Sequence, residues 1–462
     1  MKKLRIIRYI KLLIFLAFLM TSCEKNPAAY EINESNGNPP LLRDVKVQTV
    51  KVDGKWRLYK DGELYYVRGA GFSTSTYQDP GYYSEMLSNF GGNTIRTYGV
   101  SESIGDVLDA AHANGLSVAL GLWVNREADG FDYNNETLVQ QQLEKMRQDV
   151  LKYKDHPALL MWMVGNEAES NYTNLKLWNA INDICAMIHE VDPHHPTTTA
   201  LTNSDQAKVA AIVERAPELD ILSINSYAPQ MPGILNNIKV AGWEKPYMIT
   251  EFGPRGTWQM NPEPTRILPW GTPKSLVEQT STEKAEIYRS VYQDHILSNV
   301  NNGCLGSFVF VMGYQTHGEV RTWYGLNDKE RNSFGALDVM QFGWTGQYPK
   351  NRAPNIKSRE DVLLNGKRAD DAIILSPGDM NIATVKANDP DGDPLEYKWL
   401  IAPEGLGAAD NGPHEGIPNL IPQPDQRNIT FTTPPRGEYR LYVYVKDNNN
   451  KVAMAVIPFL VE

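Results

Sequence analysis

The chain of 462 residues is poor in features that mark several common protein classes. Its only cysteines are Cys23, Cys185 and Cys304, so a framework of disulfide bonds is not expected. The apolar run at 12–20 is shorter than the roughly 20 residues that a membrane-spanning helix needs. No G-x-G-x-x-G or G-x-x-x-x-G-K-[ST] pattern occurs, so the usual signals of a nucleotide-binding loop are missing.

Positive charge is also in deficit. The chain has 45 basic and 55 acidic residues, a formal net charge of −10. Removal of residues 1–22, which hold five basic and no acidic residues, leaves 40 against 55, or −15. Such a balance argues against nucleic acid or an anionic lipid surface as partner, whereas a neutral ligand is not repelled. With 23 Tyr and 10 Trp the composition is that of an ordered globular protein.

The N-terminus is typical of a secretory signal. Basic residues precede the apolar run, and the small residues Thr21 and Ser22 follow it directly before Cys23. The stretch "LMTSC" resembles a bacterial lipobox, which implies cleavage after residue 22 and a lipid on Cys23. An ordinary signal peptide with an incidental cysteine is the alternative. We expect a signal at 1–22 and a flexible tether at 23–45. "EKN" after Cys23 resembles Bacteroidetes-type lipoproteins, implying an outer-membrane anchor that faces the exterior; the sequence leaves the side open.

Between residues 64 and 345, short apolar runs alternate with amphipathic segments such as the one carrying Leu177, Ile181, Ile184 and Ile188. Several runs are apolar on both faces, as expected for strands covered by helices. The pattern predicts an α/β fold, a (β/α)8 TIM barrel at 46–348, and a doubly wound open sheet is the alternative. The eight runs are 65–72, 93–99, 117–123, 158–167, 197–202, 220–227, 246–253 and 304–313.

The pattern changes after residue 351. Short alternating runs separated by turn residues predict a small all-β immunoglobulin-like sandwich at 352–462, without a disulfide. Asp389, Asp391 and Asp393 lie in the turn "NDPDGDP" and have the chemistry of calcium ligands. Such clusters are more often solvated turns, and the spacing to a distal Glu of an EF-hand is missing, so no metal site is predicted.

Two glutamates stand where barrel enzymes carry their chemistry. Active sites of parallel barrels form at the carboxyl ends of the strands. The fourth run, "ALLMWMVGNE", ends in Asn166 and Glu167, and the seventh, "PYMITEFG", contains Glu251. Cleavage of a glycosidic bond needs one protonated and one ionised carboxyl group. Either glutamate alone is more often a salt-bridge partner or a helix cap, but the pair at these two strand ends favours catalysis.

The residues expected near each glutamate indicate which of the two is the nucleophile and which is the acid. Arg96 on the second run would hold Glu251 ionised, and the Tyr227 hydroxyl could donate to the same group, as suits a nucleophile. Glu167 follows a very apolar strand with no obvious cation beside it, so its pKa should be raised, as an acid catalyst requires. Asn166 is placed to contact the 2-hydroxyl of a sugar.

These stretches resemble a known group of enzymes. "GGNTIRTYG", "WMVGNEAE", "SINSY" and "YMITEFGPRG" look like the motifs of clan A glycoside hydrolases, which are retaining (β/α)8 enzymes. The resemblance covers about residues 64–345 and implies Glu167 as acid/base and Glu251 as nucleophile. Their separation of 84 residues, the single following sandwich and the lipoprotein start look most like family 158 of endo-β-1,3-glucanases. Family 2 barrel domains and fungal β-1,3-glucanosyltransferases are similar around "GNTIR".

Aromatic side chains are the remaining candidates, because the apolar face of a sugar packs on a ring. Tyr98 and Trp123 follow the second and third runs, and Trp258 lies in the loop after Glu251. Many clan members carry a Trp at the end of the eighth strand, where this chain offers Met312, so Trp323 is the candidate replacement. Each Trp is individually more often a core residue. The Pro-rich stretch 254–280 is expected to shape the cleft, and Gln315 and His317 are weaker candidates.

The sequence therefore predicts a surface-anchored retaining β-glycosidase that needs no cofactor. Its expected partner is a polysaccharide, β-1,3-glucan cleaved internally, and a monomer is expected. A mannanase or galactanase, a β-glucan transglycosylase and a non-catalytic glycan-binding lipoprotein on the same scaffold remain alternatives.

Overall fold

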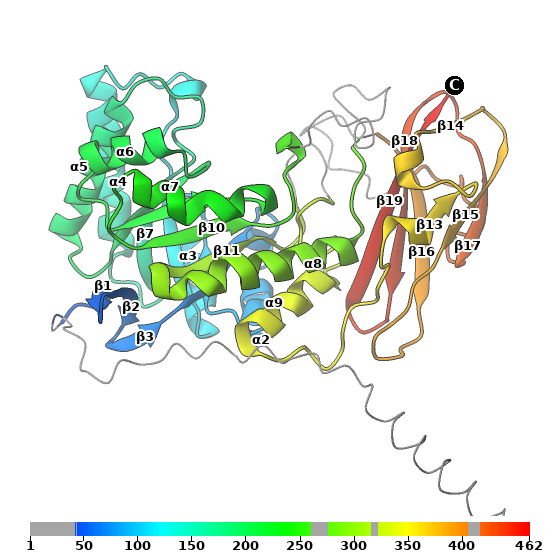
Figure 1. Ribbon diagram of the computed structural model, residues 1–462, viewed down its shortest axis with the longest axis horizontal. Helices are drawn as coiled ribbons and strands as arrows, with labels where there is room; N and C mark the ends of the chain where they lie inside the picture. The colour runs from blue at the N-terminus through cyan, green and yellow to red at the C-terminus, as the bar shows by residue number, and fades with distance from the viewer. Residues whose placement is uncertain (1–41, 43, 260–275, 316–321, 405–415) are drawn as a thin grey trace, which may run out of the picture. The chain divides into compact units, whose positions relative to one another are not determined.

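The computed structural model describes residues 42, 44–259, 276–315, 322–404 and 416–462. Eight parallel strands close into a barrel, with β11 paired to both β10 and β4 (Figure 1). The (β/α)8 prediction is confirmed, and each of the eight predicted runs contains one barrel strand. The strands are β4 (Val67–Phe72), β5 (Thr94–Arg96), β6 (Ser117–Leu122), β7 (Leu159–Asn166), β8 (Thr197–Leu201), β9 (Ile221–Asn225), β10 (Tyr247–Phe252) and β11 (Cys304–Met312).

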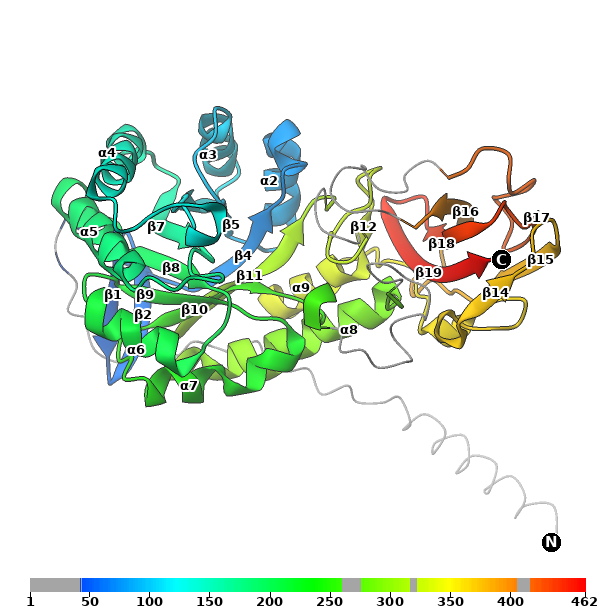
Figure 2. The same ribbon diagram turned by 90° about the horizontal axis from the view of Figure 1, so that it is seen from above.

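A helix follows each barrel strand and buries one apolar face against the sheet. In α5, the buried residues include Leu177, Ile181, Ile184 and Ile188, whose spacings of four and three place them on one side of a helix. Figure 2 shows α4, α5, α6 and α7 outside the strands. The helices are α2 (Pro80–Asn89), α3 (Ile104–Ala113), α4 (Glu136–Tyr153), α5 (Lys176–Val191), α6 (Gln206–Arg215), α7 (Ile234–Val240), α8 (Ser281–Val291) and α9 (Gly335–Thr345). Within the described ranges, no helix has the length and apolarity to cross a bilayer.

A small antiparallel sheet closes the amino-terminal end of the barrel. It consists of β1 (Val47–Val52), β2 (Lys55–Lys60) and β3 (Glu63–Tyr65). Val47 and Leu58 pack in one cluster with Met161 and Met248 from the barrel strands. This end of the barrel is therefore filled with apolar side chains, which leaves the opposite end for a ligand.

The carboxyl-terminal part is an all-β sandwich, as predicted. One sheet has the order β12-β19-β18-β16 with β14 added to β19, and the other has the order β13-β15-β17. The sequence boundary at 348–352 misses β12 (Ser333–Phe334), which lies before α9 and pairs with the start of β19. The other strands are β13 (Val362–Leu364), β14 (Ile373–Leu375), β15 (Met380–Val385), β16 (Glu396–Pro403), β17 (Asn428–Thr432), β18 (Gly437–Lys446) and β19 (Lys451–Val461).

Closure of the barrel between β4 and β11 depends on a glycine. Gly306 pairs with Val67 and has a φ of +130°, a conformation that L-residues with a side chain rarely adopt. A Cβ at this position would lie 2.2 Å from the Val67 carbonyl oxygen, which is backbone and has no room to move. The seam thus requires a residue without a side chain.

We expect Gly306→Ala to lower the free energy of unfolding by about 3 kcal/mol or more, because strain and a backbone clash add together. Urea denaturation followed by circular dichroism measures the change. Gly105→Ala is the matched control: Gly105 lies in α3 with open space around its Cα, and Ala there should raise stability by about 0.5–1 kcal/mol. Equal stability of the two variants would contradict the conclusion that pairing of β4 with β11 requires a glycine at position 306.

Candidate active site

The polar residues singled out in the sequence come together at the carboxyl end of the barrel. Arg96 ends β5, Glu167 directly follows β7, and Glu251 lies in β10. Glu167 and Glu251 line one cavity of about 870 Å³, a size suited to a ligand of several rings. The lining residues are Phe72, Ser73, Thr74, Tyr77, Tyr98, Gly99, Val100, Ser101, Ser103, Trp123, Asn166, Glu167, Tyr227, Glu251, Thr257, Trp258, Phe310, Val311, Gln315 and Tyr324.

The backbone around Glu167 is strained. Gly165 has a φ of +86° and Glu167 a φ of +50°, and the pairing of β7 with β8 shifts register between Met163 and Asn166. The Glu167 amide is held by the Ala200 carbonyl at 2.8 Å. A residue with a side chain in the left-handed region costs of order 1–3 kcal/mol, and such strain is concentrated at functional sites.

Both oxygens of Glu251 have a donor. Arg96 Nη1 lies 3.0 Å from Oε1, and the Tyr227 hydroxyl donates to Oε2 at 2.7 Å. Glu251 is 6 % exposed, Arg96 is 1 % and Tyr227 is 3 %. Burial raises the pKa of Tyr227 well above its usual range, and the negative charge of Glu251 raises it further, so the phenol keeps its proton and acts as a donor. The predicted contacts of Arg96 and Tyr227 with Glu251 are present.

Arg96 also fixes the residues beside the two carboxylates. Its Nη2 donates to Asn166 Oδ1, and its Nη1 donates to the Thr250 carbonyl and to Asn225 Oδ1. The guanidinium plane lies 4.6 Å from the centre of the Tyr98 ring. One buried cation therefore orients groups from four different strand ends.

Asn225, the last residue of β9, is a site residue that the sequence reasoning missed. Its amide nitrogen donates to Glu167 Oε1 at 2.9 Å and to Asn166 Oδ1 at 3.1 Å, and its oxygen accepts from Thr250 Oγ1 at 3.0 Å. It stands in "SINSY", two residues before Tyr227 and on the same face of the strand path. Alternation from Tyr227 was the signal that could have found it.

Glu167 has the properties of an acid catalyst. Burial and the nearby charge of Glu251 raise its pKa to about 7, and Glu169 adds to the rise. The hydrogen bond from Asn225 and the charge of Arg96 act in the opposite direction. Near neutral pH this carboxyl group is therefore able both to give and to take a proton.

Aromatic rings form much of the cavity wall. Trp258 is 65 % exposed and Trp123 is 44 % exposed, which leaves their faces open to a ligand. Tyr324 and Trp258 pack against Tyr227, with ring centres 5.2 Å away in both pairs. The Tyr98 hydroxyl is buried and has no hydrogen-bond partner among the described residues. The largely apolar wall thus includes one hydroxyl group, that of Tyr98, without a described hydrogen-bond partner.

Two expectations about the aromatics need correction. Trp323 is 3 % exposed and does not line the cavity; its indole N–H donates to the Arg255 carbonyl at 2.8 Å, so it joins two loops instead of offering a platform. Met312 is fully buried in the core cluster between the sheet and the helices, and Phe310 lines the cavity in its place. Gln315 lines the cavity as well, while His317 and most of the Pro-rich stretch, 260–275, lie outside the described residues.

The acidic turn of the sandwich brings different residues together than the sequence implied. Asp389 and Asp393 have Asp447 as their third neighbour, with one carboxylate oxygen of each within 4.8 Å of the others. The Asp391 carboxylate instead accepts from the Arg352 amide. The carboxylates of Asp389 and Asp447 also accept hydrogen bonds from backbone amides of their own turns, and Asp393 accepts one from the Asn449 side chain.

Part of the barrel is similar to a known protein family. Residues 93–258 match the family model "Glycosyl hydrolases family 2, TIM barrel domain", a span that holds both glutamates. No curated protein matches the chain. Similar solved structures include an FMN-binding β-glucuronidase from Facaelibacterium prausnitzii L2-6, with 17 % identity, a TM-score of 0.48, and coverage of 90 % of this chain and 59 % of that one.

Two further β-glucuronidase structures are similar. For the Dictyoglomus thermophilum protein the identity is 16 % and the TM-score 0.49, with coverage of 66 % of this chain and 54 % of the other. For the Parabacteroides merdae protein the identity is 13 % and the TM-score 0.46, with coverage of 90 % of this chain and 52 % of the other. The chain thus spans between half and three fifths of the length of these proteins. It carries a TIM-barrel domain of glycoside hydrolase type, matched to family 2 and not specifically to family 158.

Proposed function

We propose that the protein is a retaining β-glycosidase that cleaves within a neutral polysaccharide. The observation that supports this proposal is the difference in surroundings between two buried carboxyl groups. Glu167 has a pKa of about 7, and Glu251 accepts a hydrogen bond at each oxygen from Arg96 and Tyr227. One protonated and one ionised carboxyl group in a single cavity are the requirement for glycosidic bond cleavage.

The proposed reaction is a double displacement. Glu251 attacks the anomeric carbon as Glu167 donates its proton to the leaving oxygen, which gives a glycosyl-enzyme and a shortened glycan. Glu167, now ionised, removes a proton from water, which attacks the same carbon and releases Glu251. Asn166, held by Arg96 and Asn225, faces the cavity and is placed to contact the sugar beside the reacting carbon.

The charge of the cavity favours a neutral sugar. Among the described lining residues, the charged side chains are Glu167 and Glu251, both acidic. A uronic acid would bring a carboxylate into this negative site, and recognition of a carboxylate ordinarily uses Arg or Lys. A neutral hexose polymer meets no such repulsion, so the proposed substrate differs from what the name β-glucuronidase of the similar structures would suggest.

The positions of the exposed tryptophans favour internal cleavage. Trp123 follows β6 and Trp258 follows β10, and these strands stand four places apart in the eight-stranded barrel order. The two rings therefore flank the barrel mouth from opposite sides, so a glycan stacked on both would cross the carboxylates. We propose β-1,3-glucan as the first substrate to test, from the resemblance of the motifs, with mannan and galactan as alternatives.

A transglycosylase would use the same first step with a sugar as acceptor, and a glycan-binding protein would use the aromatic walls alone. The buried ion pair of Arg96 with Glu251 favours an enzyme, because sugar binding requires no such pair. We further propose a lipid anchor on Cys23 that holds the enzyme at the outer membrane; Cys23 lies outside the described residues.

The deciding experiment is a turnover screen of the purified protein from Cys23 onward against β-1,3-glucan, mixed-linkage glucan, cellulose, mannan, galactan and an aryl β-glucuronide. We expect short oligosaccharides from one neutral polymer, with the β-anomer formed first by NMR, and at least about a 10⁴-fold loss of kcat in Glu251→Gln. Binding without turnover would support the glycan-binding alternative, longer products would support transglycosylation, and glucuronide hydrolysis would refute the neutral-sugar proposal.

The pH dependence of kcat/KM should follow the protonation of Glu167. Only its protonated form gives a proton to the leaving group, so kcat/KM should fall as the pH rises through about 7. In Glu167→Gln this alkaline limb should disappear, whereas activity towards aryl glycosides with good leaving groups should fall less than activity towards polymer. An alkaline limb that persists at the same pH in Glu167→Gln would remove Glu167 from the acid role.

Asn225 should set the position of that limb. Its hydrogen bond lowers the pKa of Glu167, so Asn225→Ala should move the alkaline limb to higher pH. Thr250→Val is the matched control, because it removes a hydrogen bond to the Asn225 oxygen without touching Glu167. A pH–rate profile of kcat/KM for the three proteins measures the shift. A limb displaced to lower pH in Asn225→Ala would contradict the assigned donor.

A further inference from the structure

A buried cluster of charged side chains lies outside the cavity, where the sandwich meets the loops of the barrel. It consists of Glu278, Lys284, Arg440 and Glu404. Glu278 is fully buried, Lys284 is 5 % exposed and Arg440 is 2 % exposed. The Glu404 side chain is partly exposed, at 15 %. Removal of the other three charges from water is costly unless they are paired, so this cluster needs a reason within the molecule.

The cluster joins three segments. Arg440, on β18, donates to Glu404 at 2.6 Å and to the Leu276 carbonyl at 3.1 Å, and its Nη1 lies 3.8 Å from Glu278 Oε2. Glu278 also pairs with Lys284 of α8 at 2.5 Å. A sandwich strand is thus tied to the chain that leads from β10 into α8.

The same cluster reaches the segment that follows β11. The Thr322 hydroxyl donates to Glu278 Oε2 at 2.9 Å, and Lys284 Nζ donates to the Thr322 carbonyl, also at 2.9 Å. Trp323, the next residue, lies under the Lys284 ammonium and bonds the Arg255 carbonyl. Tyr324 then lines the cavity and packs on Tyr227.

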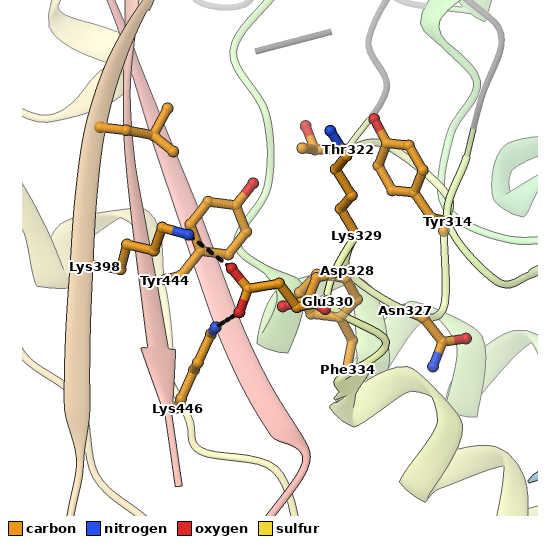
Figure 3. Close-up of a pocket in the computed structure, with 12 residues that line it drawn as sticks. Tyr314, Thr322, Asn327, Asp328, Lys329, Glu330, Phe334, Lys398, Tyr444 and Lys446 are labelled. Atoms are coloured by element: carbon orange, nitrogen blue, oxygen red, sulfur yellow. Dashed lines mark hydrogen bonds and ion pairs between the residues drawn. The ribbon is translucent and has the colours of Figure 1, made fainter. Parts of the chain in front are cut away.

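A second attachment holds the far end of this segment. Glu330 forms ion pairs with Lys398 of β16 and Lys446 of β18, and Figure 3 shows it between the two ammonium groups. These residues line a small pocket of about 70 Å³ together with Tyr314 and Thr322. Residues 322–330 are therefore linked to the sandwich directly at Glu330 and indirectly, through Glu278, at Thr322. Between these two points Tyr324 supplies part of the cavity wall.

We propose that Arg440 of the sandwich is a positioning residue for substrate binding, acting through Glu278 and Thr322 on the wall formed by Tyr324. The carboxylates themselves are held from within the barrel, by Arg96, Asn225 and Tyr227. Loss of Arg440 therefore loosens the wall that receives the glycan and leaves the reacting groups in place. The kinetic consequence rests on the proposed glycosidase function, whereas the ordering of the wall does not.

Arg440→Met should raise KM about tenfold and change kcat less than about threefold, because the substrate loses ordered contacts while the chemistry is retained. Amide hydrogen exchange should quicken about tenfold at Leu326 and Asn327, whose N–H groups bond the Val311 and Gly313 carbonyls. A merely structural role would reduce the active fraction, and so kcat, at unchanged KM.

Arg427→Met is the matched control, since Arg427 bonds the Val385 carbonyl within the sandwich, and it should match the wild type in both measurements. Thr322→Val, which removes the hydroxyl donor to Glu278, should move both readouts in the same direction and serves if Arg440→Met does not fold. Wild-type KM and wild-type exchange in the folded variant would overturn the proposal. Absence of turnover in the wild type would instead refute the glycosidase, and the exchange data would still decide the positioning role.

Discussion

The buried guanidinium of Arg96 is the interaction on which the site depends. A cation that is 1 % exposed is stable only if fixed acceptors replace the water it has lost. It finds them in Glu251, Asn166, Asn225 and the Thr250 carbonyl, contributed by the ends of three other strands. The desolvation cost of Arg96 thus becomes a constraint on geometry, because a shift of any one acceptor leaves a buried charge less well satisfied.

This constraint also makes the two glutamates different. Glu251 has Arg96 and Tyr227 at its two oxygens, whereas Glu167 has one neutral donor, Asn225, at Oε1. Because Arg96 is directed at Glu251, its charge relieves Glu167 only weakly, and burial together with the Glu251 charge raises the pKa of Glu167 to about 7. Identical side chains in one cavity are thereby placed in different electrostatic surroundings.

The regular alternation of strands and helices in the barrel could be predicted from the sequence, whereas the short elements outside this alternation could not. The barrel strands were visible because each is an apolar run of several residues bounded by turns and followed by an amphipathic helix. Glu167 and Glu251 were visible because a carboxylate after such a run is unusual. The capping sheet β1–β3 and the two-residue β12 have too little periodicity to be distinguished from loops. Phe310 was not singled out, because alternation within a fully buried strand does not tell which face meets the cavity, and Trp323 was wrongly expected to line it.

The match to the family model covers the barrel strands that carry the two glutamates and omits many residues of the cavity wall, so it leaves the substrate open. The matched residues, 93–258, contain the two glutamates proposed as catalytic together with Arg96, Asn225 and Tyr227, all on barrel strands or just after them. A large share of the cavity wall lies outside that span, on the loops after β4 and β11 that contribute Ser73, Tyr77, Gln315 and Tyr324. In the loop after β11, Glu330 forms ion pairs with the sandwich, and Thr322 bonds Glu278, which in turn lies beside Arg440 of the sandwich. A barrel of this kind can keep the residues at its strand ends and change its cavity wall through these loops, because the groups that hold the two carboxylates and the loops that line the cavity are anchored to different parts of the chain.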